Sequence, residues 1–152
     1  MLNGGVARIF VGAETEVELK EKQDRVDDAI QAVKAAKKEG ILPGGGAALH
    51  FLAANNEGLI NQSTLVGWNI LKEALFAPFN KILTNAGLNP MDKSLDKLKW
   101  GQGVDVIDGK VKEMIEAGIV DPAMVTKQAL LNAVSVALTI LSTDTVISNV
   151  RE

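Results

Sequence analysis

The sequence predicts a mainly α protein, in which helices pack as a bundle and a few short strands lie between them. Apolar residues recur at helical spacing in a charged stretch that ends near Gly40, and three further apolar segments follow it. Short runs rich in β-branched residues, bounded by glycines, indicate the strands. The 152 residues suit one ordinary domain or two small ones, and 47% hydrophobic with 23% charged residues is typical of a globular protein.

The first two predicted elements are a strand and a long helix. The run Val6–Val11 lies between glycines and needs a partner strand from elsewhere in the chain. Thr15, followed three positions later by Glu18, forms a capping box that starts the helix. Gly40, after two lysines that suit the negative end of the helix dipole, ends it. The apolar stripe of this helix comprises Val26, Ala29, Ile30, Val33 and Ala36.

Asp28 points away from that stripe, because it lies two positions, or about 200° around the helix, from Val26. From the pattern alone, a solvated acidic face is the better interpretation. The alternative is a carboxylate directed at a ligand on a neighbouring domain.

The segment Pro43-Gly44-Gly45-Gly46 leads into a second, apolar helix over 46–55. A glycine loop that opens a helix N-terminus offers unpaired N–H groups and the positive end of the helix dipole, which suits phosphate. Both common nucleotide patterns fail, however. The P-loop lysine is absent after Gly46, and the last glycine of the dinucleotide pattern would fall at Leu49. On the loop alone, a structural turn is the better interpretation.

Caps and prolines predict the remaining elements. Ser63 or Thr64 starts a helix, Pro78 marks the first turn of the next one, which ends at Gly87, and Asn89-Pro90 starts a short helix towards Trp100. Further on, we expect a short helix over 109–117, a pairing of 104–106 with 119–120, a helix from Asp121-Pro122 to about Leu141, and an edge strand over 145–150. Such a terminal edge is a candidate for pairing with another chain.

Composition excludes several kinds of site. Cysteine is absent, which excludes disulfides, thiolate catalysis and cysteine–zinc sites. His50 is the only histidine, so we predict no metal site and no Ser–His–Asp triad. A net charge of −3 without a basic stripe argues against nucleic acid as partner. No apolar run reaches the roughly 18 residues of a membrane span, and without a secretory signal we expect an intracellular protein.

Several motifs, in their order along the chain, resemble those of GroEL-type group I chaperonins. The similarity covers nearly the whole chain, is weakest from about 55 to 102, and is highly specific as a set. The motifs include Gly4-Gly5-Val6-Ala7, Val11-Gly12-Ala13, Arg25-Val26-Asp27-Asp28-Ala29, Glu39-Gly40-Ile41-Leu42-Pro43-Gly44-Gly45-Gly46, and Ala117-Gly118-Ile119-Val120-Asp121-Pro122.

The resemblance implies a segment of a ring-forming ATPase that encloses non-native polypeptides and works with a lid co-chaperonin. Residues 1–41 resemble the C-terminal half of the intermediate domain, and residues 42–152 resemble the C-terminal half of the equatorial, ATP-binding domain. The family's apical domain, its threonine-rich phosphate loop and its magnesium-binding aspartate match nothing in this sequence. The implied cofactor is ATP, with magnesium in the parent protein. The implied partners are other subunits of a homo-oligomeric ring, and the implied compartment is the bacterial cytoplasm or a mitochondrial or other organelle matrix.

The resemblance also assigns roles to particular positions. Asp28 falls on the aspartate that swings over the nucleotide and helps activate the attacking water, a role that suits a carboxylate. Gly45 falls on a backbone contact to the nucleotide. Asp105 and Val106 fall at the adenine end, where the family has Asn or Asp followed by Ala, so that Val106 departs mildly. Ile119 also falls in the nucleotide site, and Asp121 falls on the aspartate that binds the ribose hydroxyls. A helix cap before Pro122 is the competing interpretation of Asp121.

Two hypotheses about function remain. The chain is a segment of a chaperonin ATPase, or it is a non-enzymatic helical interaction module or fragment that binds no nucleotide by itself. The lack of the magnesium aspartate favours the second for the isolated chain. Asp28, Gly45 and Asp121 favour the first for the parent protein.

Overall fold

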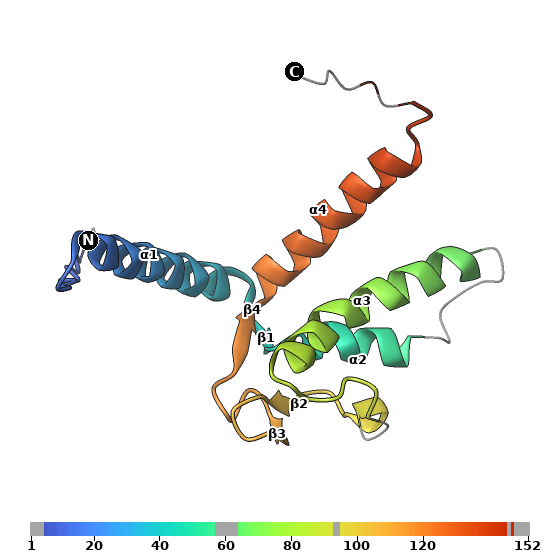
Figure 1. Ribbon diagram of the computed structural model, residues 1–152, viewed down its shortest axis with the longest axis horizontal. Helices are drawn as coiled ribbons and strands as arrows, with labels where there is room; N and C mark the ends of the chain where they lie inside the picture. The colour runs from blue at the N-terminus through green and yellow to red at the C-terminus, as the bar shows by residue number, and fades with distance from the viewer. Residues whose placement is uncertain (1–4, 57–63, 93–94, 146, 148–152) are drawn as a thin grey trace.

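The computed structural model describes residues 5–56, 64–92, 95–145 and 147, and it confirms a mainly helical fold (Figure 1). Two long helices extend in different directions from a junction that contains one small sheet, and a helical pair and the second small sheet lie below it (Figure 1). In chain order the elements are α1 (Glu16–Glu39), β1 (Ile41–Pro43), α2 (Ala47–Asn55), α3 (Leu65–Asn85), the 3₁₀ helix η2 (Leu95–Lys97), β2 (Gln102–Asp105), β3 (Lys110–Glu113), β4 (Val120–Pro122) and α4 (Ala123–Leu141).

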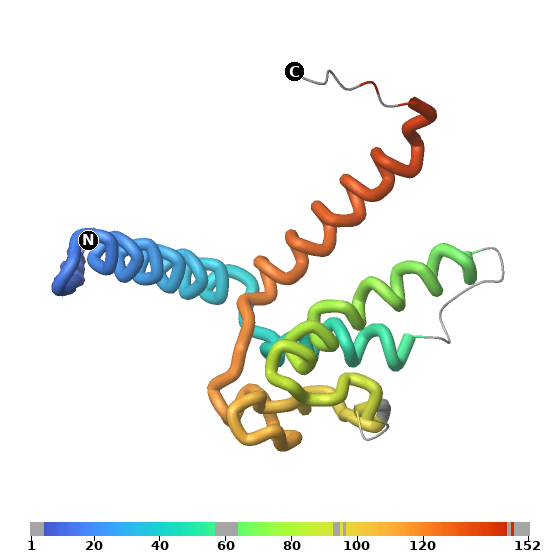
Figure 2. The backbone as a smooth tube through the Cα atoms, in the orientation of Figure 1, coloured from blue at the N-terminus to red at the C-terminus, as the bar shows by residue number. Residues whose placement is uncertain are grey.

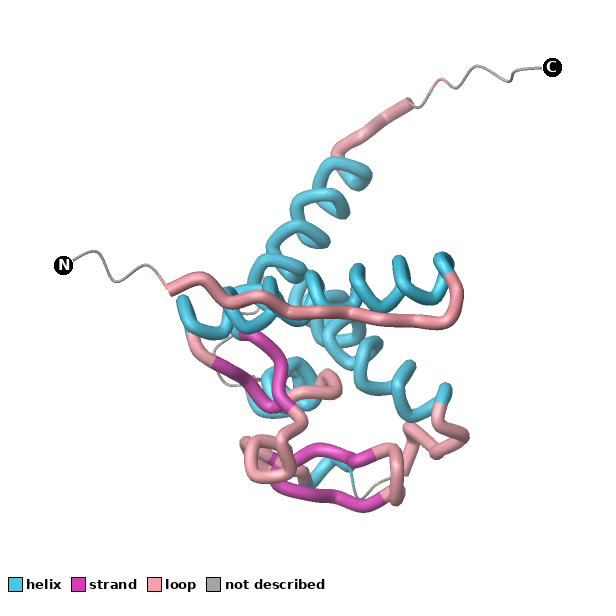
Figure 3. Tube along the Cα trace, turned by 90° about the vertical axis from the view of Figure 1, so that its left-hand side faces the viewer, coloured by secondary structure: helices cyan, strands magenta, loops and turns pink. Residues whose placement is uncertain are grey.

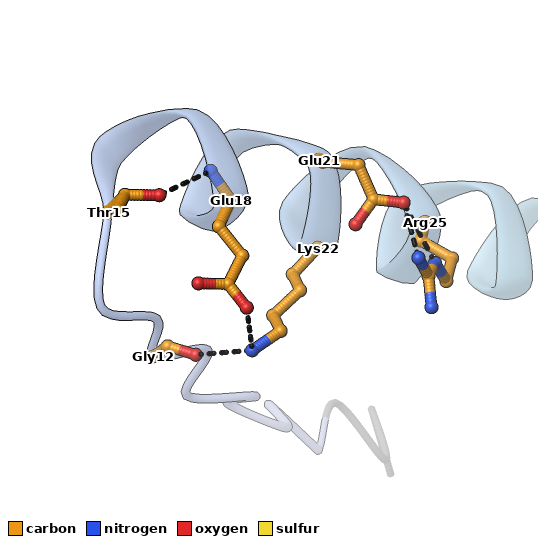
Figure 4. A network of polar contacts seen from close by, with 6 residues as sticks. All are labelled: Gly12, Thr15, Glu18, Glu21, Lys22 and Arg25. Carbon is orange, nitrogen blue, oxygen red and sulfur yellow. Dashed lines mark hydrogen bonds and ion pairs between the residues drawn. The ribbon is translucent and has the colours of Figure 1, made fainter.

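Local polar contacts fix the start of α1, as the sequence predicts. The Oγ1 of Thr15 accepts a hydrogen bond from the Glu18 backbone N–H at 3.3 Å. Lys22 forms an ion pair with Glu18 at 3.3 Å, and Arg25 forms one with Glu21 (Figure 4). Each such pair, four positions apart, stabilises a helix by a few tenths of a kcal/mol. The helix is thus held largely by its own contacts, and Ala35 is its only buried residue.

Residues 5–13 run alongside α1 without forming a strand (Figure 3). The side chain of Ile9 borders the same surface depressions as Val26 and Ile30 of the helix. The strand predicted over 6–11 is therefore wrong for this structure. A strand needs a hydrogen-bonded partner strand, and the described residues supply none to this segment.

The core lies where α3 packs against α2. Leu75, Phe79 and Leu83 recur every fourth residue on the buried face of α3. This face spans Pro78, so α3 continues through the proline, and the prediction of a new helix at that residue is wrong. Proline removes one backbone donor, but burial on both sides of it keeps the helix whole. The core cluster comprises Ala47, Phe79, Leu83, Leu95, Leu98, Val104 and Met114.

The strands pair differently from the prediction. β2 pairs with β3 in an antiparallel hairpin, with Val104 opposite Val111, so the helix predicted over 109–117 is a strand followed by turns. Gly109, at φ +69°, turns this hairpin, and its N–H donates to the Asp105 carbonyl at 2.8 Å. Residues 119–120 therefore do not pair with 104–106. The helix predicted towards Trp100 shortens to η2.

The second sheet joins segments that are far apart in the sequence. β1 pairs with β4 in antiparallel register, with Leu42 opposite Asp121 and Pro43 opposite Val120. Next to it, the N–H of Ala123 donates to the Gly40 carbonyl at 3.0 Å, and Lys127 pairs with Glu39 at 2.5 Å. These contacts attach the end of α1 to the start of α4.

α4 leads away from α2 and α3, and none of its residues is buried (Figure 2). In length and composition it is apolar enough to cross a membrane, although it contains no uninterrupted apolar run of about 18 residues. Helices that pack in protein cores pass the same test, and Lys127, Gln128 and Asn132 interrupt the apolar sequence. The predicted strand over 145–150 lies almost wholly outside the described residues.

Candidate functional site

The candidate site forms where the glycine loop meets β4. Gly44 donates its N–H to the Ile119 carbonyl at 3.0 Å, which ties the loop to the residue before β4. The N–H of Gly45 forms a hydrogen bond with the carboxylate of Asp121. Three of the predicted nucleotide contacts, Gly45, Ile119 and Asp121, are therefore brought together by the pairing of β1 with β4.

Glycine is required in this loop for steric reasons. A Cβ on Gly44 would lie 3.0 Å from backbone atoms of Ile119 and Val120. Gly45 and Gly46 have φ values of +66° and +77°, a region that other residues rarely adopt. The loop thus approaches β4 closely on one side and begins α2 on the other. A backbone this bare lets a ligand approach it closely as well.

A cavity of about 610 Å³ opens beside these residues, between α4 and the pair α2–α3. Gly45, Gly46, Asp121 and Thr126 line it together with many apolar side chains. The apolar residues in its lining include Leu49, Leu75, Pro78, Ile82, Val125 and Leu130. A cavity with a few polar groups in an apolar wall is the usual form of a small-molecule or domain-packing site.

Asp121 is half-buried, and its environment disfavours the charged form. Burial raises the pKa of its carboxyl, and the hydrogen bond from Gly45 lowers it by less. The competing interpretation, a helix cap, is not what the structure has: the N-cap of α4 is Pro122, with no side-chain cap. Burial of a charged carboxylate costs free energy, and a carboxylate kept in such a place beside a glycine loop is a candidate ligand-binding group.

Ile119 contributes to the site through its backbone. Its side chain packs against the core cluster, and its N–H donates to the Met114 carbonyl at 2.8 Å. Its carbonyl holds Gly44 in place. In this structure Ile119 therefore fixes the position of the glycine loop through its backbone carbonyl.

Asp105 and Val106 lie on the β2–β3 hairpin, and neither lines the cavity beside Asp121. Asp105 is only 9% exposed. Its Oδ2 lies 2.7 Å from the ammonium of Lys112, and its Oδ1 accepts the Ile107 N–H at 3.0 Å. The hydrogen bond from Lys112 lowers the pKa of Asp105 and also that of Asp108.

This arrangement predicts an acid-labile hairpin. Both carboxyl pKa values lie below the ordinary aspartate value, so the ion pairs are intact above that value and are lost as the pH falls through the lowered pKa values. We expect the Ile107 amide to lose protection from hydrogen exchange in that acidic window, followed by NMR. An amide in the α1 helix, such as that of Ala29, is the control. Because Lys112 lowers the pKa of Asp105, a Lys112→Met variant should lose this protection at a higher pH than the wild type and keep it at neutral pH.

Asp28 lies apart from the other predicted residues. It is exposed on α1, in a shallow depression that Val17, Lys20, Glu21, Asp24 and Arg25 also line. It does not line the cavity next to Asp121. The helix α1 that carries it is bonded to β4 and α4 through Gly40 and Glu39, and its residues from Gln31 to Lys38 lie beside Met124 of α4.

Within the described ranges, no group of three histidine, aspartate or glutamate residues could hold a metal ion. His50 is buried, with its ring against Phe76 and Phe79 and its Nε2 3.2 Å from the Leu95 carbonyl. It is a packed core histidine.

Sequence reasoning missed Met114, which connects the two parts of the site. It is 1% exposed, and a Cβ on Gly103 would lie 2.8 Å from its Cγ, while a Cβ on Gly45 would lie 3.3 Å from its Cε. The hairpin with Asp105 is thereby packed against the glycine loop. A methionine in a stretch expected to be a helix gave no signal of this contact.

Comparisons with known proteins find similar sequences and solved structures. The chain matches the model of the TCP-1/cpn60 chaperonin family over residues 1–151. It is 46% identical over 154 residues to a protein named Chaperonin GroEL, chloroplastic, from Cyanidium caldarium, and covers 29% of that protein's length. It is also similar to a crystal structure of a group III chaperonin in the open state, with a TM-score of 0.82 and 35% identity over 90% of this chain and 30% of the other.

Proposed function

Because the chain belongs to the TCP-1/cpn60 chaperonin family, we propose that it acts as a segment of an ATP-dependent chaperonin subunit that assists protein folding in a ring. It spans less than a third of the length of the relatives that it matches, so the activity proposed is that of a larger subunit. The observation that carries the proposal is the contact between Gly45 and Asp121 at the end of the cavity.

In this proposal Asp121 binds the ribose hydroxyls of ATP, and Gly45 contacts the nucleotide through its backbone. A carboxylate accepts two O–H hydrogen bonds from a sugar, and its raised pKa reflects a desolvation cost that such donors would offset. Asp105 and Val106 lie at the base end. Magnesium would be held by residues other than those that the structure describes, among which no group of three His, Asp or Glu side chains could hold a metal ion.

We further propose that residues 1–41 belong to an intermediate domain and residues 42–152 to an equatorial domain. Gly40, at φ +85°, separates α1 from β1 and is the natural pivot between them. A swing of α1 about this position would carry Asp28 towards the nucleotide, where its carboxylate would orient the attacking water.

The apolar cavity lining and the exposed face of α4 support the proposal that other chaperonin sequence covers them. Leu131, Leu138 and Leu141 of α4 are 57%, 61% and 79% exposed. Large exposed apolar surfaces mark interaction sites. The proposed partners are the rest of the equatorial domain and neighbouring ring subunits; a lid co-chaperonin and unfolded polypeptides would bind an apical domain outside this chain. The chloroplastic relative favours an organelle matrix, and the bacterial cytoplasm is the alternative.

The same exposed surface favours the second candidate, a non-enzymatic interaction module that binds no nucleotide alone. The two candidates differ in whether the isolated chain binds ATP. Equilibrium titration of the chain with a fluorescent ATP analogue tests this, with the signal expected to disappear in Asp121→Ala. Binding that is unaffected by this change would contradict the assigned site.

We expect the isolated chain to hydrolyse ATP negligibly, even where it binds it. Phosphoryl transfer depends on a metal ion and on positioning of water, and Asp28 lies outside the cavity in this structure. A steady-state phosphate-release assay with magnesium present should give a rate indistinguishable from that of Asp28→Asn. Turnover typical of a chaperonin would show the expectation to be wrong.

A further inference from the structure

The β2–β3 hairpin contains an ion cluster that the family resemblance does not explain. The Nζ of Lys112 lies 2.7 Å from Asp105 Oδ2 and 2.8 Å from Asp108 Oδ2. The remaining oxygen of Asp105 accepts the Ile107 N–H at 3.0 Å. Asp105 is the residue expected to contact the nucleobase, and both of its carboxylate oxygens are therefore already bonded within the hairpin.

Exposure decides which group a ligand would meet here. The Asp105 side chain is 12% exposed, whereas the Lys112 side chain is 38% exposed. An ammonium has three N–H donors, and the two ion pairs direct two of them at the aspartates. The more exposed group is thus the ammonium of Lys112, whose third N–H is not used by these two ion pairs. The carboxylate of Asp105, which is a hydrogen-bond acceptor, is the more buried of the two.

The two groups prefer different purines when they face the substituent at C6 of the base. A carboxylate accepts a hydrogen bond from the 6-amino group of adenine and repels the 6-carbonyl oxygen of guanine or hypoxanthine. An ammonium donates a hydrogen bond to a 6-carbonyl oxygen. It has no lone pair, so it cannot accept a hydrogen bond from a 6-amino group. Replacing one by the other at the base edge therefore changes the preference of the site between 6-amino and 6-oxo purines.

We propose that Lys112 is a specificity-determining residue that relaxes the discrimination of this site between 6-amino and 6-oxo purine nucleotides. The inference rests on the proposed function, which puts Asp105 and Val106 at the base. Val106 is 42% exposed and apolar, so it can pack on the face of either purine without distinguishing them. Discrimination then depends on the Lys112–Asp105 pair.

The test is the ratio of the dissociation constants for ATP and inosine triphosphate, which has a carbonyl oxygen at C6 of the base. Each nucleotide is titrated into the whole chain with magnesium present, and amide shifts are followed by NMR. We expect the wild-type constants to agree within about threefold, and Lys112→Met to shift the ratio towards ATP by roughly three- to tenfold, the size of one hydrogen bond. Lys112→Arg should keep the wild-type ratio.

Lys110→Met is the matched control. Lys110 lies two positions away on β3, on the same face of the hairpin, and its removal changes the net charge equally. We expect its ratio to equal that of the wild type. The Ile107 amide and the core resonances of Met114 report whether each variant keeps the fold.

The outcomes separate this inference from the proposed function. If both nucleotides bind and Lys112→Met weakens them equally, or leaves their ratio unchanged, Lys112 is only structural and the inference is overturned alone. If neither nucleotide shifts any resonance of the wild-type chain, the proposed function fails and the inference falls with it. A shift of the ratio in Lys110→Met as large as in Lys112→Met would assign the effect to net charge, and would also overturn the inference.

Discussion

Replacing Gly46 by alanine is expected to destabilise the fold severely. The residue has a φ of +77°, and a Cβ there would lie 2.9 Å from the backbone nitrogen of Phe79 and 3.0 Å from its Cα. The left-handed backbone costs an ordinary residue about 1–2 kcal/mol, and overpacking a core costs about 1–3 kcal/mol more. The free energy of unfolding should therefore fall by roughly 2–5 kcal/mol, measured by urea denaturation followed by circular dichroism.

Gly67→Ala is the matched control for this change. Gly67 is an exposed residue in α3, and a Cβ there would meet nothing within 4 Å. Alanine stabilises a helix interior by about 0.5–1 kcal/mol relative to glycine. The same chemical change should thus raise stability at one position and lower it at the other. Equal effects at both positions would mean that α2 and α3 do not pack as described.

Asp121→Asn should have opposite effects on binding and on stability. The neutral amide cannot accept both ribose hydroxyls, so ATP affinity should fall at least about tenfold, the value of a lost hydrogen bond to a charged group. The charged carboxylate is disfavoured by burial, so its removal should raise the free energy of unfolding at neutral pH.

The pH dependence identifies the cause of that gain. Because folding raises the pKa of Asp121, the folded wild type binds more protons than the unfolded chain and loses stability as the pH rises from the ordinary aspartate value through the raised one. The stability gain of Asp121→Asn should therefore be present above this window and vanish below it. Asp144→Asn, at an exposed position outside the helices, controls for charge. A gain that persists below the window would show that the desolvation argument is wrong.

Local signals predicted both ends of α1 and the start of α2 correctly. The capping box at Thr15, the end at Gly40 and the start of α2 after Gly46 are all found in the structure. Such features depend on residues a few positions apart, which the sequence displays directly. The failures came from tertiary contacts. Pro78 sits inside a helix because Leu75 and Phe79 are buried on either side of it.

Strand pairing was the least predictable feature. The run 119–120 could pair with 104–106 on composition alone, and Ile41–Pro43 gave no strand signal because it ends in proline next to a glycine loop. The pairing of β1 with β4 joins segments far apart in the sequence, next to Ile119, which packs against the core cluster that includes Met114. Asp121 and Gly45 were singled out by resemblance, and their hydrogen bond became visible only with the fold. Lys112 was not singled out, since a lysine in an expected surface helix is ordinary.

The pairing of β1 with β4 also affects how the protein matures during synthesis. Pro43 leaves the ribosome long before Val120, its partner in the ladder, has been translated. Until then the glycine loop has no Ile119 carbonyl to bind, and the nascent chain must close a long loop at an entropic cost before the strands meet. A chain truncated before β4 should therefore form α1 and the α2–α3 pair, but its glycine loop would not be held against Ile119 and Asp121.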